Sequence, residues 1–204
     1  MYNNIVNSTI IAPLLSLVGQ ALKAVNYYYL WYGDDFDSER PNECGGCQGV
    51  HLIFDRSEVE LDWDYRPEFR GGDGGIAYHL TASDHSTRRE YLRASTTDNV
   101  GGLTLISAAE TRLWRKFIDK PITHLELLGE HLDGERCSPQ ALRLYFPDES
   151  VIIAIGMTPY NDPPVMYVGD GDEVLVFSEQ DWVSPVQQGV VGIEALIICW
   201  ELSG

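Results

Sequence analysis

Alternating apolar and charged positions mark the clearest strands in the chain. In residues 58–64, Glu-Val-Glu-Leu-Asp-Trp-Asp, the apolar side chains point to one side and four carboxylates to the other. This pattern is typical of a half-buried antiparallel strand with an acidic face toward water. Residues 151–155 are apolar at every position, which predicts a central strand. Residues 165–168 and 174–177 flank the turn sequence Gly-Asp-Gly-Asp and predict a β-hairpin.

Two further segments predict elements that pack on these strands. Ser107 stands three residues before Glu110 in capping-box spacing, and the apolar residues Leu113, Trp114 and Phe117 follow at helical intervals. The pattern predicts a helix over 107–117 that packs on the sheet. The run 193–202 is largely apolar and predicts an interior strand.

An internal repeat organises these elements. Two copies line up over three segments: 17–30 with 117–130, 51–54 with 143–146, and 59–61 with 151–153. Each copy is interpreted as a short helical or turn entry, a strand, a polar loop and a hairpin. The sequence therefore predicts an α+β fold, mostly antiparallel β-sheet, from two pseudo-repeated helix-strand-hairpin units with few short helices. We expect a single domain over 1–204, with halves at about 14–65 and 107–157 plus a C-terminal β-hairpin and strand.

Length and composition narrow the class of protein. The chain has 204 residues, 44% of them hydrophobic, and a mean hydropathy of −0.16, which predicts a folded soluble protein. The apolar stretch 10–18 is interrupted by Pro13 and follows no Lys or Arg, so it does not resemble a signal peptide. Four cysteines are too few for a disulfide framework in a chain of this size. We therefore expect reduced thiols and a cytoplasmic location.

The net charge of −17 is the strongest global property of the chain. Such a charge repels nucleic-acid phosphates and anionic lipids, and it speeds association with basic surfaces. It argues against nucleic-acid and membrane partners and favours a basic protein partner. Solubility alone is the other explanation for this charge.

Cys44-Gly-Gly-Cys47 is the densest set of metal-ligand types. Two thiols at this spacing suit half of a tetrahedral zinc site. Cys137 lies in the corresponding loop of the second copy, so a site of Cys44, Cys47, Cys137 and His51 forms if the loops meet, with His131 as an alternative to His51. The alternative is a polar loop with reduced thiols and no cofactor.

The aromatic run 27–32 adds a second candidate surface. As a strand it places Tyr28 and Tyr32 on one face, next to an acidic loop. That face either packs in the core or forms a tyrosine-rich interface with a basic partner. The partner-binding candidates on the loop, the strand at 58–64 and this run are Asp34, Asp35, Asp37, Glu58, Glu60, Asp62, Asp64, Tyr28 and Tyr32.

The layout resembles the acidic α+β immunity proteins of bacterial polymorphic or contact-dependent toxin systems. The residues that carry this resemblance are 17–30 with 51–63 and 117–130 with 141–156. The resemblance implies a cytoplasmic inhibitor that binds one cognate toxin and blocks its active site. We expect a monomer or homodimer. No Gly-x-Ser-x-Gly, His-Glu-x-x-His or Walker sequence is present, so we favour a binding module over an enzyme. The alternatives are a small enzyme or ligand-binding protein with a cleft between the halves, with or without zinc, and a subunit of a larger assembly.

Overall fold

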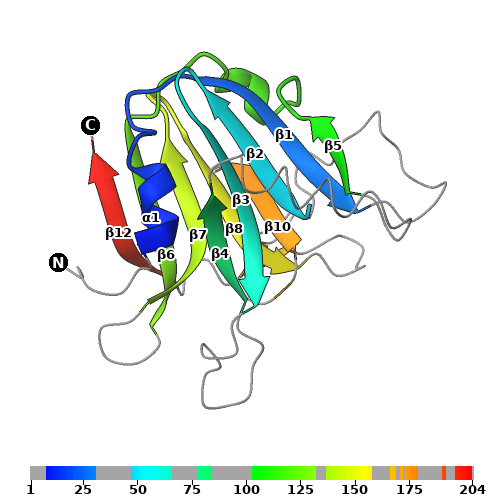
Figure 1. Cartoon of the computed structure of the whole chain (residues 1–204), viewed down its shortest axis with the longest axis vertical. Coiled ribbons are helices and arrows are strands. Elements are labelled where there is room, and N and C mark those ends of the chain that lie inside the picture. The colour runs from blue at the N-terminus through cyan, green and yellow to red at the C-terminus, as the bar shows by residue number, and fades with distance from the viewer. Residues whose placement is uncertain are drawn as a thin grey trace.

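Two β-sheets pack face to face in the computed structural model (Figure 1). The structure describes residues 8–30, 47–65, 78–83, 103–131, 137–157, 166–168, 171, 173–178, 190–191 and 196–203. The five-stranded sheet has the order β4-β3-β2-β1-β5, with β1 Leu22–Leu30, β2 Gly49–Phe54, β3 Glu58–Tyr65, β4 Tyr78–Ser83 and β5 Leu103–Ser107. All of its pairings are antiparallel.

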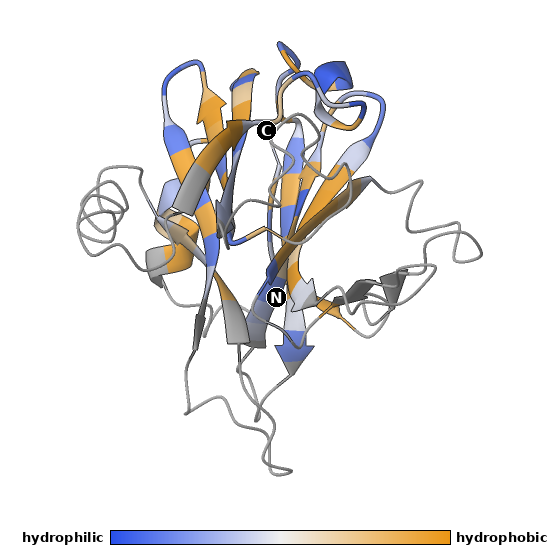
Figure 2. Cartoon of the chain, turned by 90° about the vertical axis from the view of Figure 1, so that its right-hand side faces the viewer, coloured by the Kyte–Doolittle hydropathy of each residue, from blue (hydrophilic) through white to orange (hydrophobic). Residues whose placement is uncertain are grey.

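The second sheet has seven strands in the order β11-β9-β8-β7-β6-β12, and β10 also pairs with β8. Its strands are β6 His124–His131, β7 Cys137–Tyr145, β8 Ser150–Met157, β9 Met166–Val168, β10 Glu173–Ser178, β11 Val190–Val191 and β12 Ile197–Ser203. Only the β11–β9 pairing is parallel among the described strands. Figure 2 shows apolar and polar residues alternating along many strands, as expected when one face of each sheet is buried.

The predicted α+β class is wrong, because the described residues form mostly antiparallel sheet with one short α-helix. Its helices are α1, Ser8–Leu14, which packs against β4, and a 3-10 turn, η2, Trp114–Lys116. The predicted helix over 107–117 does not form. Ser107 pairs with Asn26 in the sheet instead, and Trp114 is buried by the 3-10 turn that follows.

The two copies of the repeat are three-stranded meanders rather than helix-strand-hairpin units. In the first meander, Asn26 pairs with His51 and His51 with Glu60. In the second, Glu126 pairs with Arg143 and Arg143 with Ile152. These are equivalent positions in the sequence alignment of the copies, so β1-β2-β3 and β6-β7-β8 have the same register. One meander lies in each sheet.

The segments that enter β1 and β6 pair with each other. Four backbone hydrogen bonds join them: Gly19 N to Ile122 O (2.8 Å), Asp119 N to Leu22 O (2.7 Å), Leu22 N to Lys120 O (3.1 Å) and Ile122 N to Gln20 O (3.0 Å). Each bond has its counterpart with the copies exchanged. Gly19 (φ 80°) and Asp119 (φ 64°), also equivalent, both have left-handed backbone conformations. The repeat therefore extends to the backbone that links the two sheets.

A single main core fills the space between the sheets. It takes the inward side chains of both meanders, for example Val25, Leu52 and Leu61 from one and Leu127 and Ile153 from the other. Residues 151–155 are fully buried and β8 has partners on both sides, so the prediction of a central strand here is confirmed.

The C-terminal elements differ from the prediction in their pairing. β9 and β10 occupy the expected positions, but both pair with β8 rather than forming a hairpin with each other. β12 pairs with β6 at the edge of the sheet order, so the predicted interior strand is an edge strand. Its side chains alternate, with Cys199 buried and Ile198, Glu201 and Ser203 exposed. None of the helices in the described residues is long and apolar enough to cross a membrane.

Candidate functional sites on the two outer faces

The charged side of β3 lies on the outer face of the five-stranded sheet. Val59 and Leu61 enter the core, whereas Glu58, Glu60 and Asp62 alternate with them and face outward. Glu58 is exposed and Asp62 is partly exposed. Glu60 departs from the prediction of a water-facing carboxylate, because only 1% of its surface is accessible.

Tyr28 is the hydrogen-bond partner of Glu60 on this face. It lies on the outer face of β1 opposite Gly49 of β2, and its hydroxyl donates a hydrogen bond to Glu60 Oε1. A Cβ atom on Gly49 would lie 3.3 Å from Tyr28 Cδ2 and 3.0 Å from the carbonyl oxygen of Leu61. The tyrosine ring therefore packs over a position that has no side chain. Tyr28 is 2% exposed and is part of the interior of this face.

His51, on β2, connects β1 and β3 through its side chain on this outer face. Asn26 Nδ2 donates to His51 Nδ1 (3.3 Å), which leaves the proton on Nε2, 3.1 Å from Glu58 Oε2. His51 itself is 3% exposed. We call this set the acidic face: Asn26, Tyr28, His51, Glu58, Glu60 and Asp62. Hydrogen bonds between neighbouring strands fix several of its polar groups.

Other predicted partner-binding residues fall outside the described chain. These are Asp34, Asp35, Asp37 and Tyr32. Asp64 has a described backbone in β3 but no described side chain. Their role in partner binding stays a prediction.

The predicted zinc set is not brought together by the residues that the structure describes. Cys47 belongs to the core between the sheets, where its Sγ lies within hydrogen-bonding distance of the carbonyl oxygens of Gly49 (3.3 Å) and Val174 (3.4 Å). Burial raises the pKa of the Cys47 thiol to about 12. His51 lies on the outer face, across the sheet from that core. Cys44 and the side chain of Cys137 lie outside the description.

One cysteine departs from the expectation of reduced thiols. Cys199, on the edge strand β12, is disulfide-bonded, whereas Cys47 is free. The cysteine bonded to Cys199 is not among the described side chains. Cys199 lies beside the irregularity between Ile198 and Trp200 in the β12–β6 register.

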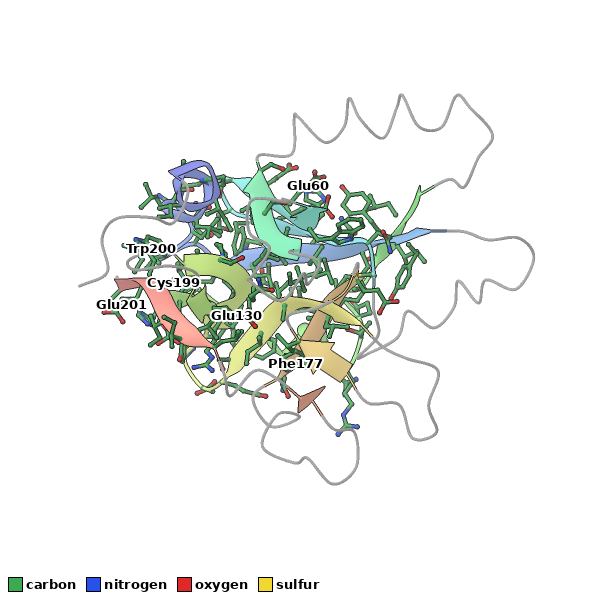
Figure 3. All side chains as sticks on the ribbon, turned by 90° about the horizontal axis from the view of Figure 1, so that it is seen from below. Glu60, Glu130, Phe177, Cys199, Trp200 and Glu201 are labelled. Carbon is green, nitrogen blue, oxygen red and sulfur yellow. The ribbon has the colours of Figure 1, made fainter. Side chains whose placement is uncertain are left out.

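A second polar group lies on the outer face of the other sheet. β6 pairs with β12 so that His124 is opposite Ser203 and Glu126 is opposite Glu201. His124, Glu126 and Glu201 each offer one ligand-type atom, and these three atoms lie within 4.8 Å of one another. We call these three residues the edge cluster. Figure 3 shows Glu201 at the β12 end of the molecule, with Glu60 and Phe177 on opposite sides of the two layers.

Hydrogen bonds hold two members of the edge cluster in place. Glu126 Oε2 accepts from Tyr145 Oη (2.9 Å) and Arg143 Nη1 (3.1 Å). His124 Nδ1 is 2.8 Å from Ser203 Oγ, and its Nε2 is 3.4 Å from Glu126 Oε1. Burial raises the pKa of Tyr145 above its usual value, which keeps its hydroxyl protonated as a donor. One oxygen of Glu126 and one nitrogen of His124 therefore face each other.

The sequence analysis did not single out the residues of the edge cluster. One signal was present, because His124 and Glu126 are two residues apart in a strand and must share a face. The third member, Glu201, comes from a strand at the other end of the chain. Its place beside Glu126 follows from the β6–β12 pairing, which no local pattern encodes.

Comparisons with protein-family models, with curated proteins and with solved structures find no match to this chain.

Proposed function

We propose that this chain is an acidic protein-binding module whose acidic face docks a basic partner protein. The observation that supports this most directly is the common orientation of Glu58, Glu60 and Asp62 on the outer side of β3. Glu58 and Asp62 present two accessible carboxylates beside the buried Glu60, within a chain that already carries −17 charges. A partner with a basic surface is attracted at long range and oriented as it arrives.

The positions of the lysines are consistent with this proposal. All three lysines of the sequence pair with carboxylates in or near turns, away from the middle of β3: Lys23 with Asp55 (3.2 Å) and Asp119 (2.8 Å), Lys116 with Glu149 (2.6 Å), and Lys120 with Asp148 (3.0 Å). These pairs lie at the end of the sandwich where the two copies of the repeat meet. The three lysines therefore form ion pairs at that end of the sandwich. They do not offset the excess of acidic residues in the chain.

The acidic face also has the rigidity that a docking surface needs. Tyr28 holds Glu60, and the pairing of His51 with Asn26 and Glu58 links three strands. Side chains that are already ordered lose less conformational entropy when a partner binds. The resemblance to immunity proteins suggests the partner class, a toxin with a basic phosphate-binding cleft that the carboxylates would enter.

Site-specific cross-linking tests the proposal. A photo-reactive residue replaces the exposed Glu58, and a second protein carries it at the exposed Glu130 of the other sheet as a control. Proteins cross-linked in the native cell are identified, and the partner is then purified. The proposal expects a basic protein that is captured from position 58 and not from position 130.

Association rates with that purified partner complete the test. Glu58→Lys/Asp62→Lys is compared with Glu110→Lys/Glu130→Lys, which changes the net charge equally at other exposed positions. We expect the first pair to slow association by about tenfold or more at low salt and to weaken its salt dependence. Equal rates for the two double variants, or an acidic partner, would show that the acidic face is not the docking surface.

A small enzyme or ligand-binding protein is the second candidate function. The edge cluster favours it, because a histidine and two carboxylates are residues that bind metal ions and carry out acid-base chemistry. A zinc site built on Cys47 gains no such support from the buried position of its thiol.

A further inference from the structure

We infer that the edge cluster is a binding site for one divalent transition-metal ion of the zinc type, with His124, Glu126 and Glu201 as its ligands. This inference is independent of the proposed function, because the acidic face and the edge cluster lie on different sheets. Imidazole nitrogen and carboxylate oxygen together suit Zn²⁺ and its neighbours in the first transition series, whereas Mg²⁺ and Ca²⁺ prefer oxygen ligands alone.

The distances in the cluster are close to those of a metal site. Two ligand atoms at about 2.0–2.1 Å from a tetrahedral zinc ion are roughly 3.3 Å from each other. His124 Nε2 and Glu126 Oε1 are 3.4 Å apart. All three ligand-type atoms lie within 4.8 Å of one another, and Glu201 is exposed, so its side chain is free to rotate inward. Water completes the coordination on the open side of the edge strand.

The surrounding hydrogen bonds orient the ligands as second-sphere contacts do in metal sites. Tyr145 and Arg143 hold Oε2 of Glu126, which leaves Oε1 for a metal ion. Ser203 contacts Nδ1 of His124, which leaves Nε2. A divalent ion would take the place of the contact between Nε2 and Oε1, with the single N–H of the neutral imidazole on Nδ1, where it can donate to Ser203 Oγ.

The charge of the cluster is compatible with a cation. Glu126 and Glu201 carry two negative charges and Arg143 carries one positive charge, so one negative charge remains before the metal binds. Arg143 contacts Oε2 of Glu126 and not the oxygen that faces His124. A strand-edge ion pair alone would account for Arg143 and Glu126, but it would not account for His124 facing the remaining carboxylate oxygen with a ligand-type atom of Glu201 within 4.8 Å.

The first copy of the repeat provides an internal comparison. By strand register, Ala24, Asn26 and Ser107 occupy the positions that correspond to His124, Glu126 and Glu201. The same backbone arrangement therefore accepts residues that are poor metal ligands. The fold does not require a histidine and two carboxylates here, so the residue types in the second copy need a separate explanation, which metal binding supplies.

The test measures binding of Zn²⁺ alone by calorimetry and of Co²⁺ alone by visible absorption, on the full chain purified and treated with chelator. We expect one ion per chain and an affinity that falls by at least about tenfold in His124→Ala and in Glu201→Gln. Glu130→Gln, the same change at an exposed position of the paired strand β6, should bind like the unmodified chain. Tyr145→Phe keeps all three ligands and should weaken binding by about tenfold through Glu126.

Three results would overturn the inference. The first is no saturable binding of either ion. The second is equal binding by all variants, which would mean diffuse attraction by the −17 chain. The third is a thiolate-to-cobalt charge-transfer band, which would place the ion on cysteines. Circular dichroism and unfolding midpoints identify any variant that fails to fold. If a ligand variant does not fold, the metal affinity of Tyr145→Phe, which changes no metal ligand, tests the inference in its place.

Discussion

Gly49→Ala should destabilise the protein by displacing Tyr28. The new methyl carbon would lie 3.0 Å from the carbonyl oxygen of Leu61 and 3.3 Å from Tyr28 Cδ2. Both distances are shorter than ordinary van der Waals contacts, and the Leu61 oxygen belongs to the backbone of a paired strand. The tyrosine ring is the group that can move. Its movement carries the hydroxyl away from Glu60, so the substitution also perturbs the acidic face.

The magnitude follows from two contributions. Inserting a methyl group into a packed site typically costs about 1–3 kcal/mol. A hydrogen bond to a charged group contributes about 1.5–3 kcal/mol. The gain from restricting the unfolded chain, about 0.4–1 kcal/mol for Gly→Ala, opposes both. We expect Gly49→Ala to lower the free energy of unfolding by about 2–4 kcal/mol, and Tyr28→Phe to lower it by about 1.5–3 kcal/mol.

A double-mutant cycle in urea tests the proposed route through Tyr28. If Gly49→Ala acts partly by breaking the Tyr28–Glu60 hydrogen bond, it should cost less in the Tyr28→Phe background than in the unmodified chain. A coupling of more than about 0.5 kcal/mol is then expected. Additive losses would refute the link to Tyr28, and an unchanged stability of Gly49→Ala would refute the steric argument itself.

Three further predictions concern single positions. Gly19→Ala should cost about 1–2 kcal/mol in urea unfolding, because its φ of 80° disfavours a side chain although no atom lies within 4 Å, and Gly19→Asn should cost less; equal losses would contradict this. The Ala21 N–H and then Lys23 lower the pKa of Asp55, so its stabilising effect is present above its unfolded pKa and is lost as pH falls through the folded pKa. Asp55→Asn should therefore flatten the loss of stability below about pH 4 in an acid titration followed by circular dichroism, and an unchanged acid limb would contradict this. Burial raises the pKa of Cys47 to about 12, so peptide mapping should show its alkylation at pH 8 only under unfolding conditions; rapid labelling of the folded protein would contradict this.

Local sequence patterns correctly predicted where these strands lie, but they also predicted a helix that does not form. The alternation in 58–64 and the uniform apolarity of 151–155 correspond to β3 and β8. Over 107–117, helical spacing and a capping box predict a helix, yet Ser107 completes β5 by pairing with β1. Trp114 is buried there by a 3-10 turn, and its indole N–H donates to Tyr27 Oη. Tertiary hydrogen bonds and burial outweighed a weak local preference.

For the candidate sites too, local sequence predicted one part and the tertiary structure decided the other. Period-two alternation places Glu58, Glu60 and Asp62 on one face, and this much could be predicted. The burial of Glu60 depends on a tyrosine from β1 and a glycine from β2, so it could not be predicted from β3 alone. In the edge cluster, the adjacency of His124 and Glu126 on one face is local, but Glu201 reaches them only through the pairing of β6 with β12.

The sequence by itself determined the strand periodicity, the charge and the alignment of the two copies, because these depend on residue order and composition alone. The tertiary structure decided that the copies form separate sheets, that β9 and β10 both pair with β8, and that the terminal strand closes an edge beside His124. Strand partners are chosen by the burial of whole faces and by hydrogen bonds between distant segments. That choice also decides which polar side chains become neighbours, and therefore where the candidate sites lie.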